Sequence, residues 1–315
     1  MMAAQDDKPL LDLSDGHTGE TSFWAGSLES PDTAISGLLS IPTATSSERA
    51  PAVVVSHGSA GMGTYWPRLY TAELHSIGIA TFFVDHFTSR GVRETATDQN
   101  RVSRFQMGQD DFHALRLLRT HPLIDNDKIG VMGFSKGGVV ALETAIFTAY
   151  ADFWNAGLKF RFHIAMYPGC AWQVEQIGRN TAPILLLVGD KDDWAPAAAC
   201  IEYADRIRAA GVPIEVRCYA NALHAWDGPD SAAPKWLKDT IAFRNCRFFV
   251  REDGTWIDRN DGNRLLTTAE QRADAARRCS SFGNTIGANV HIREQCISDI
   301  KAFLRDVALT KSRMT

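Results

Sequence analysis

The chain has 315 residues, of which 45% are hydrophobic and 22% are charged, and its formal net charge at pH 7 is -4. This composition is typical of a soluble globular protein, and the length fits one large α/β domain or two smaller ones. An acidic chain without a run of lysine and arginine argues against nucleic acid as a partner, and no apolar run is long enough to span a membrane.

Short apolar runs alternate with longer stretches of helical pattern from Ser22 to about Leu304, which predicts βαβ units and a mostly parallel sheet. In chain order we expect strands at 37–42, 52–58, 79–87, 128–135, 162–168, 184–190 and 214–220, with 22–28 pairing antiparallel with the first. Helices are expected at 67–77, 101–119, 136–149, 197–210 and 292–304. Runs such as AVVVS and ILLLV do not alternate, so helices should cover both faces of the sheet. The predicted fold class is a doubly wound α/β fold.

A polar insert at about 227–290 interrupts this alternation before the last helix. Within it, the stretch 247–257 predicts a hairpin that turns at Asp253 and Gly254, because a tight turn needs a positive φ. Thr267 and Glu270 resemble a capping box that starts a helix ending near Cys279. We interpret the chain as a flexible segment at 1–20 and a single domain at 21–315. The insert lies either over the mouth of the site or elsewhere on the surface, and we slightly favour the surface.

One serine lies among glycines in the sequence GFSKGG, between the predicted strand 128–135 and the predicted helix 136–149. A strand, the pattern G-x-S-x-G and a helix are the context of a nucleophile elbow. Side chains at 133 and 137 would collide with the backbone of so sharp a turn, and glycine removes them. The same geometry presents the Ser135 hydroxyl above the sheet edge and aims the Lys136 amide at an incoming carbonyl oxygen.

A serine nucleophile needs a base, and the base needs an orienting acid. The order expected after an elbow serine is an acid and then a histidine, each following a strand. The loop GDKDDWAP offers three aspartates, of which we prefer Asp192, and the loop YANALHAWD offers His224. Upstream, the small-residue turn HGSAG allows a backbone amide to approach an oxyanion, with Ser59 as the expected donor beside Lys136.

Together these four motifs resemble the dienelactone hydrolase family of the α/β-hydrolase fold, over nearly the whole chain from about residue 22. The resemblance implies about eight mostly parallel strands with the site at their carboxyl ends. It also implies Ser135 as nucleophile, Asp192 as acid and His224 as base. The founding members carry a cysteine nucleophile and a glutamate in the early loop, where this chain has Ser135 and a histidine-glycine turn. This departure argues against dienelactone itself as the substrate.

The six cysteines are scattered, with no spacing that suggests a metal site, so buried thiols and disulfides both remain open. The stretches YPGC and DDWAPAAAC resemble an exported subgroup of the family, which implies a disulfide between Cys170 and Cys200. The first residues lack the pattern of a signal peptide, although an alanine pair before a polar stretch is compatible with one already removed. A cytoplasmic and an exported location both stay open.

Bulky and cationic residues near these loops indicate where a substrate binds. Trp172, Trp194 and Trp226 suggest an apolar pocket for the acyl or alcohol group, or else ordinary core filling. Arg90 is a candidate for binding a substrate carboxylate, with a surface role as the alternative. The sequence thus predicts a serine hydrolase that cleaves a small ester or lactone through an acyl-enzyme and needs no metal or other cofactor.

Two other functions remain open from the sequence alone, and the oligomeric state is not indicated. One is a peptidase of the prolyl-oligopeptidase type, which has the same order of catalytic residues but usually a propeller domain. The other is a binding protein that uses this fold without chemistry.

Overall fold

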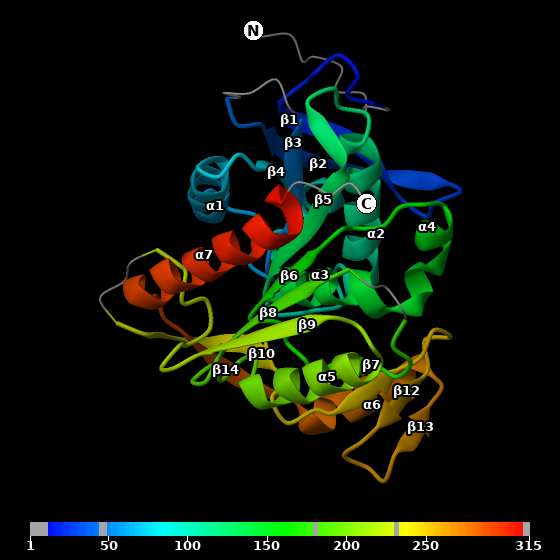
Figure 1. Cartoon of the computed structure of the whole chain (residues 1–315). Helices are drawn as coiled ribbons and strands as arrows, with labels where there is room; N and C mark the ends of the chain where they lie inside the picture. Colours follow the sequence, from blue (N-terminus) through cyan, green and yellow to red (C-terminus); the bar gives the residue numbers. More distant parts are fainter. Residues whose placement is uncertain (1–11, 44–48, 179–181, 230–232, 311–315) are drawn as a thin grey trace, which may run out of the picture.

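The computed structural model describes residues 12–43, 49–178, 182–229 and 233–310, and its centre is an eight-stranded sheet (Figure 1). The strand order is β1-β2-β4-β3-β5-β6-β8-β9. All neighbouring pairs from β4 to β9 are parallel, whereas β2 runs antiparallel to both β1 and β4. The strands are β1 (Gly19–Gly26), β2 (Pro31–Ser40), β3 (Ala50–Ser56), β4 (Ala80–Asp85), β5 (Ile124–Phe134), β6 (His163–Met166), β8 (Ile184–Gly189) and β9 (Ile214–Tyr219). The predicted α/β class with about eight strands is therefore confirmed.

Helices cover both faces of this sheet, as the non-alternating strands predict. On one face α1 (Tyr65–His75) and α7 (Val290–Leu304) pack against Val53, Val55 and Met132. On the other face lie α2 (Arg104–Leu118), α3 (Lys136–Ile146) and α5 (Ala197–Ala209) (Figure 1). Adjacent strand residues such as Val53 and Val54 belong to opposite cores, because strand side chains alternate between faces. Shorter elements are η1 (Thr88–Arg90), η2 (Thr148–Tyr150), α4 (Ala151–Asn155) and η3 (Arg305–Leu309).

The insert forms two small sheets of its own. One sheet has the order β13-β12-β11-β7. Its strand β11 pairs parallel with β7, which lies outside the insert, between β6 and β8 in the sequence. The other sheet is an antiparallel ribbon of β10 and β14. Ile286, at the end of β14, forms a β-bridge with His224, so this end of the ribbon lies beside the loop of His224. The two sheets and the helix of the insert consist of β7 (Trp172–Val174), β10 (Lys235–Ala242), β11 (Phe248–Val250), β12 (Trp256–Asp258), β13 (Arg264–Leu266), α6 (Ala269–Cys279) and β14 (Ser281–Ile286).

Two local predictions for the insert can be compared with these elements. The hairpin is confirmed, since β11 and β12 pair antiparallel and Gly254 has φ 77° in the turn. The capping box lies one residue later than predicted: the Thr268 hydroxyl accepts the Gln271 N–H, and the Gln271 side chain accepts the Thr268 N–H. Glutamine serves this motif as well as glutamate, so Thr267 with Glu270 was the wrong pair.

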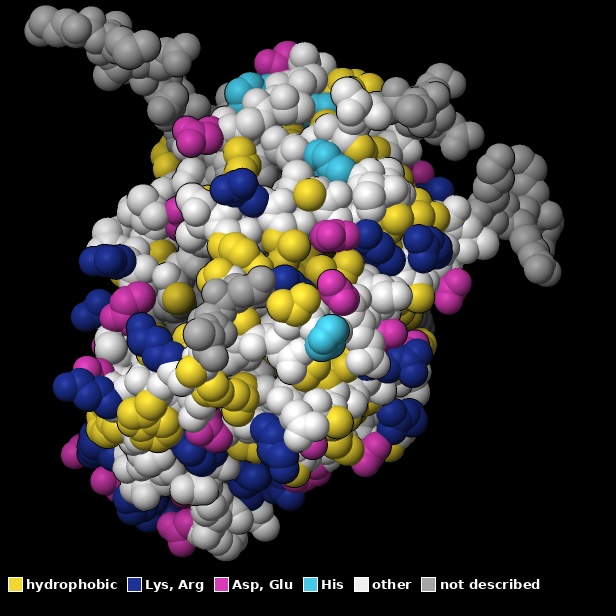
Figure 2. Space-filling view, turned by 90° about the vertical axis from the view of Figure 1, so that its left-hand side faces the viewer, with side chains coloured by type: hydrophobic (Ala, Val, Ile, Leu, Met, Phe, Trp, Pro, Cys, Tyr) yellow, Lys and Arg dark blue, Asp and Glu magenta, His cyan; other side chains and the backbone are white. Residues whose placement is uncertain are grey.

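Residues 1–11 of the predicted flexible segment lie outside the described residues, and the first strand begins at Gly19. On the face shown in Figure 2, basic and acidic side chains are intermixed, which agrees with the small formal charge of the chain. No helix among the described residues combines the length and the apolar character needed to cross a membrane.

Candidate active site

Ser135 occupies a sharp turn between β5 and α3. Its backbone has φ 52° and ψ -111°, a conformation that residues other than glycine rarely adopt. A Cβ atom at Gly133 would collide with the carbonyl oxygen of Gly137, and one at Gly137 would lie 2.6 Å from the carbonyl oxygen of His57. Glycine at both positions thus permits the turn that presents the Ser135 side chain at the carboxyl end of the sheet.

The structure brings Ser135, His224 and Asp192 together in one chain of hydrogen bonds. His224 Nε2 lies 2.9 Å from Ser135 Oγ, and His224 Nδ1 lies 2.7 Å from Asp192 Oδ2. Because a carboxylate only accepts, Nδ1 carries the imidazole hydrogen, and Nε2 is left to accept the hydroxyl hydrogen of Ser135. Asp192 and His224 are both buried, whereas Ser135 is partly exposed.

Backbone amides fix the orientation of the Asp192 carboxylate. Its Oδ1 accepts the N–H groups of Trp194 (2.9 Å) and Ala195 (2.7 Å), so Oδ2 is the oxygen that faces His224. The other two aspartates of the loop point elsewhere: Asp190 accepts the N–H of Asn221, and Asp193 accepts both the N–H and the hydroxyl of Thr285. Only Asp192 of these three contacts the imidazole.

Asp227, a buried residue that the sequence analysis does not identify, holds the tyrosine that packs against the His224 ring. The Tyr167 ring lies edge-on to His224, with centroids 4.9 Å apart. The Tyr167 hydroxyl donates to Asp227 Oδ1 at 2.8 Å, and Asp227 Oδ2 accepts from Tyr70 and Trp66. Burial raises the pKa of Asp227. The available signal was an acidic residue three positions after the histidine in an otherwise apolar stretch.

The predicted oxyanion residues lie on neighbouring segments around Ser135. The Ser59 carbonyl accepts the N–H of Thr95, and the Ser59 hydroxyl is hydrogen-bonded to Gln99. The Lys136 side chain is buried, and its Nζ donates to Thr95 Oγ1 and to the carbonyl oxygens of Gln99 and Val102. Burial, with a contribution from nearby Arg104, lowers the pKa of Lys136 to about 7. These contacts connect the elbow, the turn at Ser59 and the segment 95–102.

A cavity of about 730 Å³ opens at this point, and Ser135, His224, Ser59, Trp172 and Trp194 are among the residues that line it. Its volume lies in the range found for small-molecule sites. Trp226 lies outside the cavity, because it is fully buried between the rings of Tyr167 and Tyr219. Of the three tryptophans, Trp226 is therefore the one that fills the core.

The insert forms much of the cavity wall, contrary to our slight preference for a surface location. The lining includes residues from the segment between β10 and β11, from the hairpin turn and from α6. The parallel pairing of β11 with β7 explains this position, since β7 directly follows the wall residues Cys170 and Ala171. A core of Ala171, Phe248, Leu266 and Ala275 also attaches the insert to the main domain.

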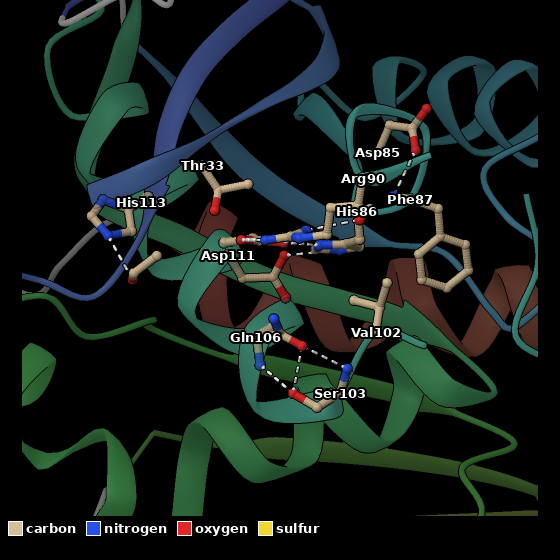
Figure 3. Close-up of polar contacts among 12 residues, drawn as sticks. Thr33, Asp85, His86, Phe87, Arg90, Val102, Ser103, Gln106, Asp111 and His113 are labelled. Carbon is tan, nitrogen blue, oxygen red and sulfur yellow. Dashed lines mark hydrogen bonds and ion pairs between the residues drawn. The ribbon is translucent and has the colours of Figure 1, made fainter. Parts of the chain in front are cut away.

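Arg90 is not among the residues that line the cavity, and it lies in a largely buried polar cluster beside His86 (Figure 3). Its guanidinium donates to both oxygens of Asp110, at 2.7 and 2.9 Å, and to the carbonyl oxygen of His86. His86 Nδ1 also contacts Asp110, and Asp111 accepts the hydroxyl of Ser56. Burial raises the pKa of Asp111 to about 7. The expectation of substrate binding by Arg90 is corrected, because its donors are used by a fully buried carboxylate.

The implied disulfide between Cys170 and Cys200 is also corrected. Both residues are free thiols, and their sulfur atoms both contact the carbonyl oxygen of Pro168. In the part of the chain that the structure describes, a disulfide joins Cys246 to Cys279, and both cysteines belong to the insert. It connects the segment before β11 to the end of α6. Among the described residues, no three His, Cys, Asp or Glu side chains are grouped to hold a metal ion.

Comparison with known proteins gives a family and several relatives. The model of the dienelactone hydrolase family matches residues 35–242. A probable 2-oxo-3-(5-oxofuran-2-ylidene)propanoate lactonase of Bradyrhizobium sp. is 25% identical over 216 residues, which cover 64% of this chain and 84% of that protein. The uncharacterized peptidase YtmA of Bacillus subtilis is 25% identical over 141 residues, covering 37% of this chain and 55% of that protein.

A solved structure shares the fold. It is named a "putative dienelactone hydrolase" from Klebsiella pneumoniae, and it superposes with a TM-score of 0.50 at 15% identity, covering 82% of this chain and 95% of that chain.

Proposed function

The chain belongs to the dienelactone hydrolase family and is a carboxylic ester hydrolase, and on this premise we propose that it acts through a Ser135-His224-Asp192 triad and an acyl-enzyme. The observation that carries the proposal is the continuous hydrogen-bonded chain from Asp192 through His224 to Ser135, at the wall of a cavity. A hydroxyl with a hydrogen-bonded base and an oriented imidazole is the arrangement that nucleophilic acyl transfer requires.

The first half of the reaction forms the acyl-enzyme. Ser135 Oγ attacks the carbonyl carbon of the substrate while His224 Nε2 takes the hydroxyl proton, and Asp192 stabilises the imidazolium. The N–H groups of Lys136 and Ser59 stabilise the negative charge that develops on the carbonyl oxygen. The bond to the leaving oxygen then breaks, and this oxygen takes the proton from His224 Nε2.

The second half releases the acid. Water attacks the ester carbonyl of Ser135 while His224 takes a proton from it, and the proton returns to Ser135 Oγ as the acid departs. With a lactone as substrate, the leaving oxygen stays attached to the acyl chain, so the product is a single ring-opened acid. We propose small esters or lactones as substrates, in keeping with the lactonase among the relatives.

A panel of p-nitrophenyl esters, lactones and amides tests this function, assayed with wild type and with Ser135→Ala and His224→Ala. We expect ester or lactone turnover by wild type and its loss in both variants, with thermal unfolding little changed. Turnover that persists in Ser135→Ala would show that another group is the nucleophile.

A peptidase is the second candidate, because one relative is named as a peptidase. The same panel separates the two functions. A peptidase would cleave a proline anilide at a kcat/KM comparable to that for the aryl ester, whereas we expect the ester to be strongly preferred.

A further inference from the structure

Resting on the proposed function, we propose that Arg247 and Arg272 form an anion subsite in the same cavity. The substrate is then an ester or lactone that carries a carboxylate on the part of the molecule facing the insert. Both arginines belong to the insert, and both line the cavity that contains Ser135. They also lie beyond residue 242, where the match to the family model ends.

The wall of the cavity carries an excess of positive charge. Five arginines line it, at positions 104, 244, 247, 251 and 272, whereas its acidic residues are Glu143 and Glu252. Three of these arginines form ion pairs within the protein, one of them between Arg244 and Asp193. Arg104 forms an ion pair with Glu143 at 2.8 Å, and Arg251 binds Glu175 through two nitrogens at 2.6 and 3.1 Å.

Arg247 and Arg272 differ from these paired arginines, because neither forms an ion pair with a carboxylate of the described residues. Arg247 donates through one terminal nitrogen to the carbonyl oxygens of Arg244 and Cys246. Arg272 donates through one terminal nitrogen to the carbonyl oxygen of Thr267. These contacts anchor each side chain and leave its other N–H donors for a ligand. Both side chains are partly buried, so an anion there would be partly shielded from solvent.

The same wall has further donors without acceptors. The Nε of Arg244 and the Nε1 of Trp172 are buried and have no hydrogen-bond partner among the described residues. Arg244 is otherwise held by Asn284 and Gly283, and its Nη1 lies 3.9 Å from Asp193. Protein atoms enclose both the Arg244 Nε and the Trp172 Nε1, so the donors that a ligand can reach are those of Arg247 and Arg272. Their unpaired positive charge favours a ligand that supplies oxygen acceptors and negative charge.

A disulfide and a helix cap fix the backbone near Arg247 and Arg272. Arg247 directly follows Cys246, whose disulfide partner Cys279 ends α6, the helix that carries Arg272. The capping box at Thr268 and Gln271 fixes the start of the same helix. The subsite is therefore built on anchored elements. A planar guanidinium matches a carboxylate with two parallel hydrogen bonds, which makes arginine more selective than lysine for such a group.

Matched substrates test the proposal on the wild-type protein. The p-nitrophenyl half-esters of adipic and suberic acid carry a distal carboxylate, and their methyl-capped forms have the same chain without the charge. We expect kcat/KM to be at least about 10-fold higher for the charged member of each pair, since a charge-assisted hydrogen bond contributes about that factor or more. A ratio of one or less in wild type would overturn the proposal without any variant.

Variants then assign the effect to residues. Arg247→Gln and Arg272→Gln should each lower the charged-to-capped ratio about 10-fold, and Arg247→Lys should restore part of it. Arg277→Gln is the matched control, because Arg277 is exposed on the same helix and does not line the cavity. An unchanged ratio in both glutamine variants, or an equal fall in Arg277→Gln, would contradict a local subsite.

Binding gives a readout independent of turnover. In Ser135→Ala, adipate should raise the thermal unfolding temperature more than hexanoate does, and Arg272→Gln in that background should abolish the difference. If wild type hydrolyses no ester or lactone at all, the proposed function fails. If it hydrolyses capped and charged esters equally well, that function stands and only the anion subsite fails.

Discussion

Asp192→Asn changes one atom next to His224 and leaves the shape of the site unchanged. The N–H groups of Trp194 and Ala195 both donate to Asp192 Oδ1, so the asparagine must keep its oxygen on that side. Its NH₂ group then takes the place of Oδ2, 2.7 Å from His224 Nδ1. A donor at this position forces Nδ1 to accept, and the imidazole hydrogen moves to Nε2. A protonated Nε2 faces Ser135 Oγ and cannot take its proton.

We therefore expect kcat for a p-nitrophenyl ester to fall about 10⁴-fold, equivalent to about 5.5 kcal/mol of barrier, by analogy with the same change in a serine protease. The folded structure should survive, since the substitution is isosteric, and a thermal unfolding curve checks this. Asp193→Asn is the matched control: its carboxylate binds Thr285 and does not contact the imidazole, so most of the wild-type kcat should remain. A fall of less than about 10-fold in a folded Asp192→Asn protein would refute the orienting role.

Three further predictions concern stability. Burial raises the pKa of Asp111 to about 7 from 3.8, so the folded state holds a proton that the unfolded state loses, and stability should fall by up to about 4 kcal/mol as pH rises from about 4 to 7. Denaturation at several pH values should show this slope flattened in Asp111→Asn, and an unaltered slope would contradict the assignment. Cys246→Ser should destabilise by about 4 kcal/mol, given the separation of 33 residues, and should raise KM for esters because the insert lines the cavity. The exposed free thiol of Cys218 provides the control, and equal effects of the two serine substitutions would argue against the disulfide. Gly137→Ala should cost about 3 kcal/mol or more, because its Cβ meets backbone oxygens of residues 56 and 57; a variant with normal stability would contradict the tight elbow.

The sequence was informative where local rules determine structure. Apolar runs and glycine spacing predict the parallel strands and the turn at Ser135, because these features depend on neighbouring residues. The order of motifs along the chain predicts that Asp192 and His224 follow strands, and parallel strands bring such loops to one edge. The carboxylate of Asp227 has a weaker local signal, and its role depends on Tyr167, which is 60 positions away.

Features that depend on distant pairing were not predictable in this way. The position of the insert follows from the pairing of β11 with β7, two strands separated by more than 70 residues, and no periodicity in either indicates it. The same holds for the disulfide between Cys246 and Cys279, since six cysteines allow many pairings. The position of Arg90 in a loop after a strand suggests that it binds the substrate. It binds the buried Asp110 instead, and Asp110 lies on α2, a separate element that the pattern around Arg90 does not reveal.

Covalent labelling of Ser135 tests the catalytic proposal most directly. Wild type treated with a fluorophosphonate and analysed by intact-mass spectrometry should gain one adduct, and peptide mapping should locate it on Ser135. The adduct should be absent in Ser135→Ala and should form far more slowly in His224→Ala, because the hydroxyl then lacks its base. A folded, ester-hydrolysing wild type that gains no adduct, or that carries it on another residue, would contradict Ser135 as the nucleophile.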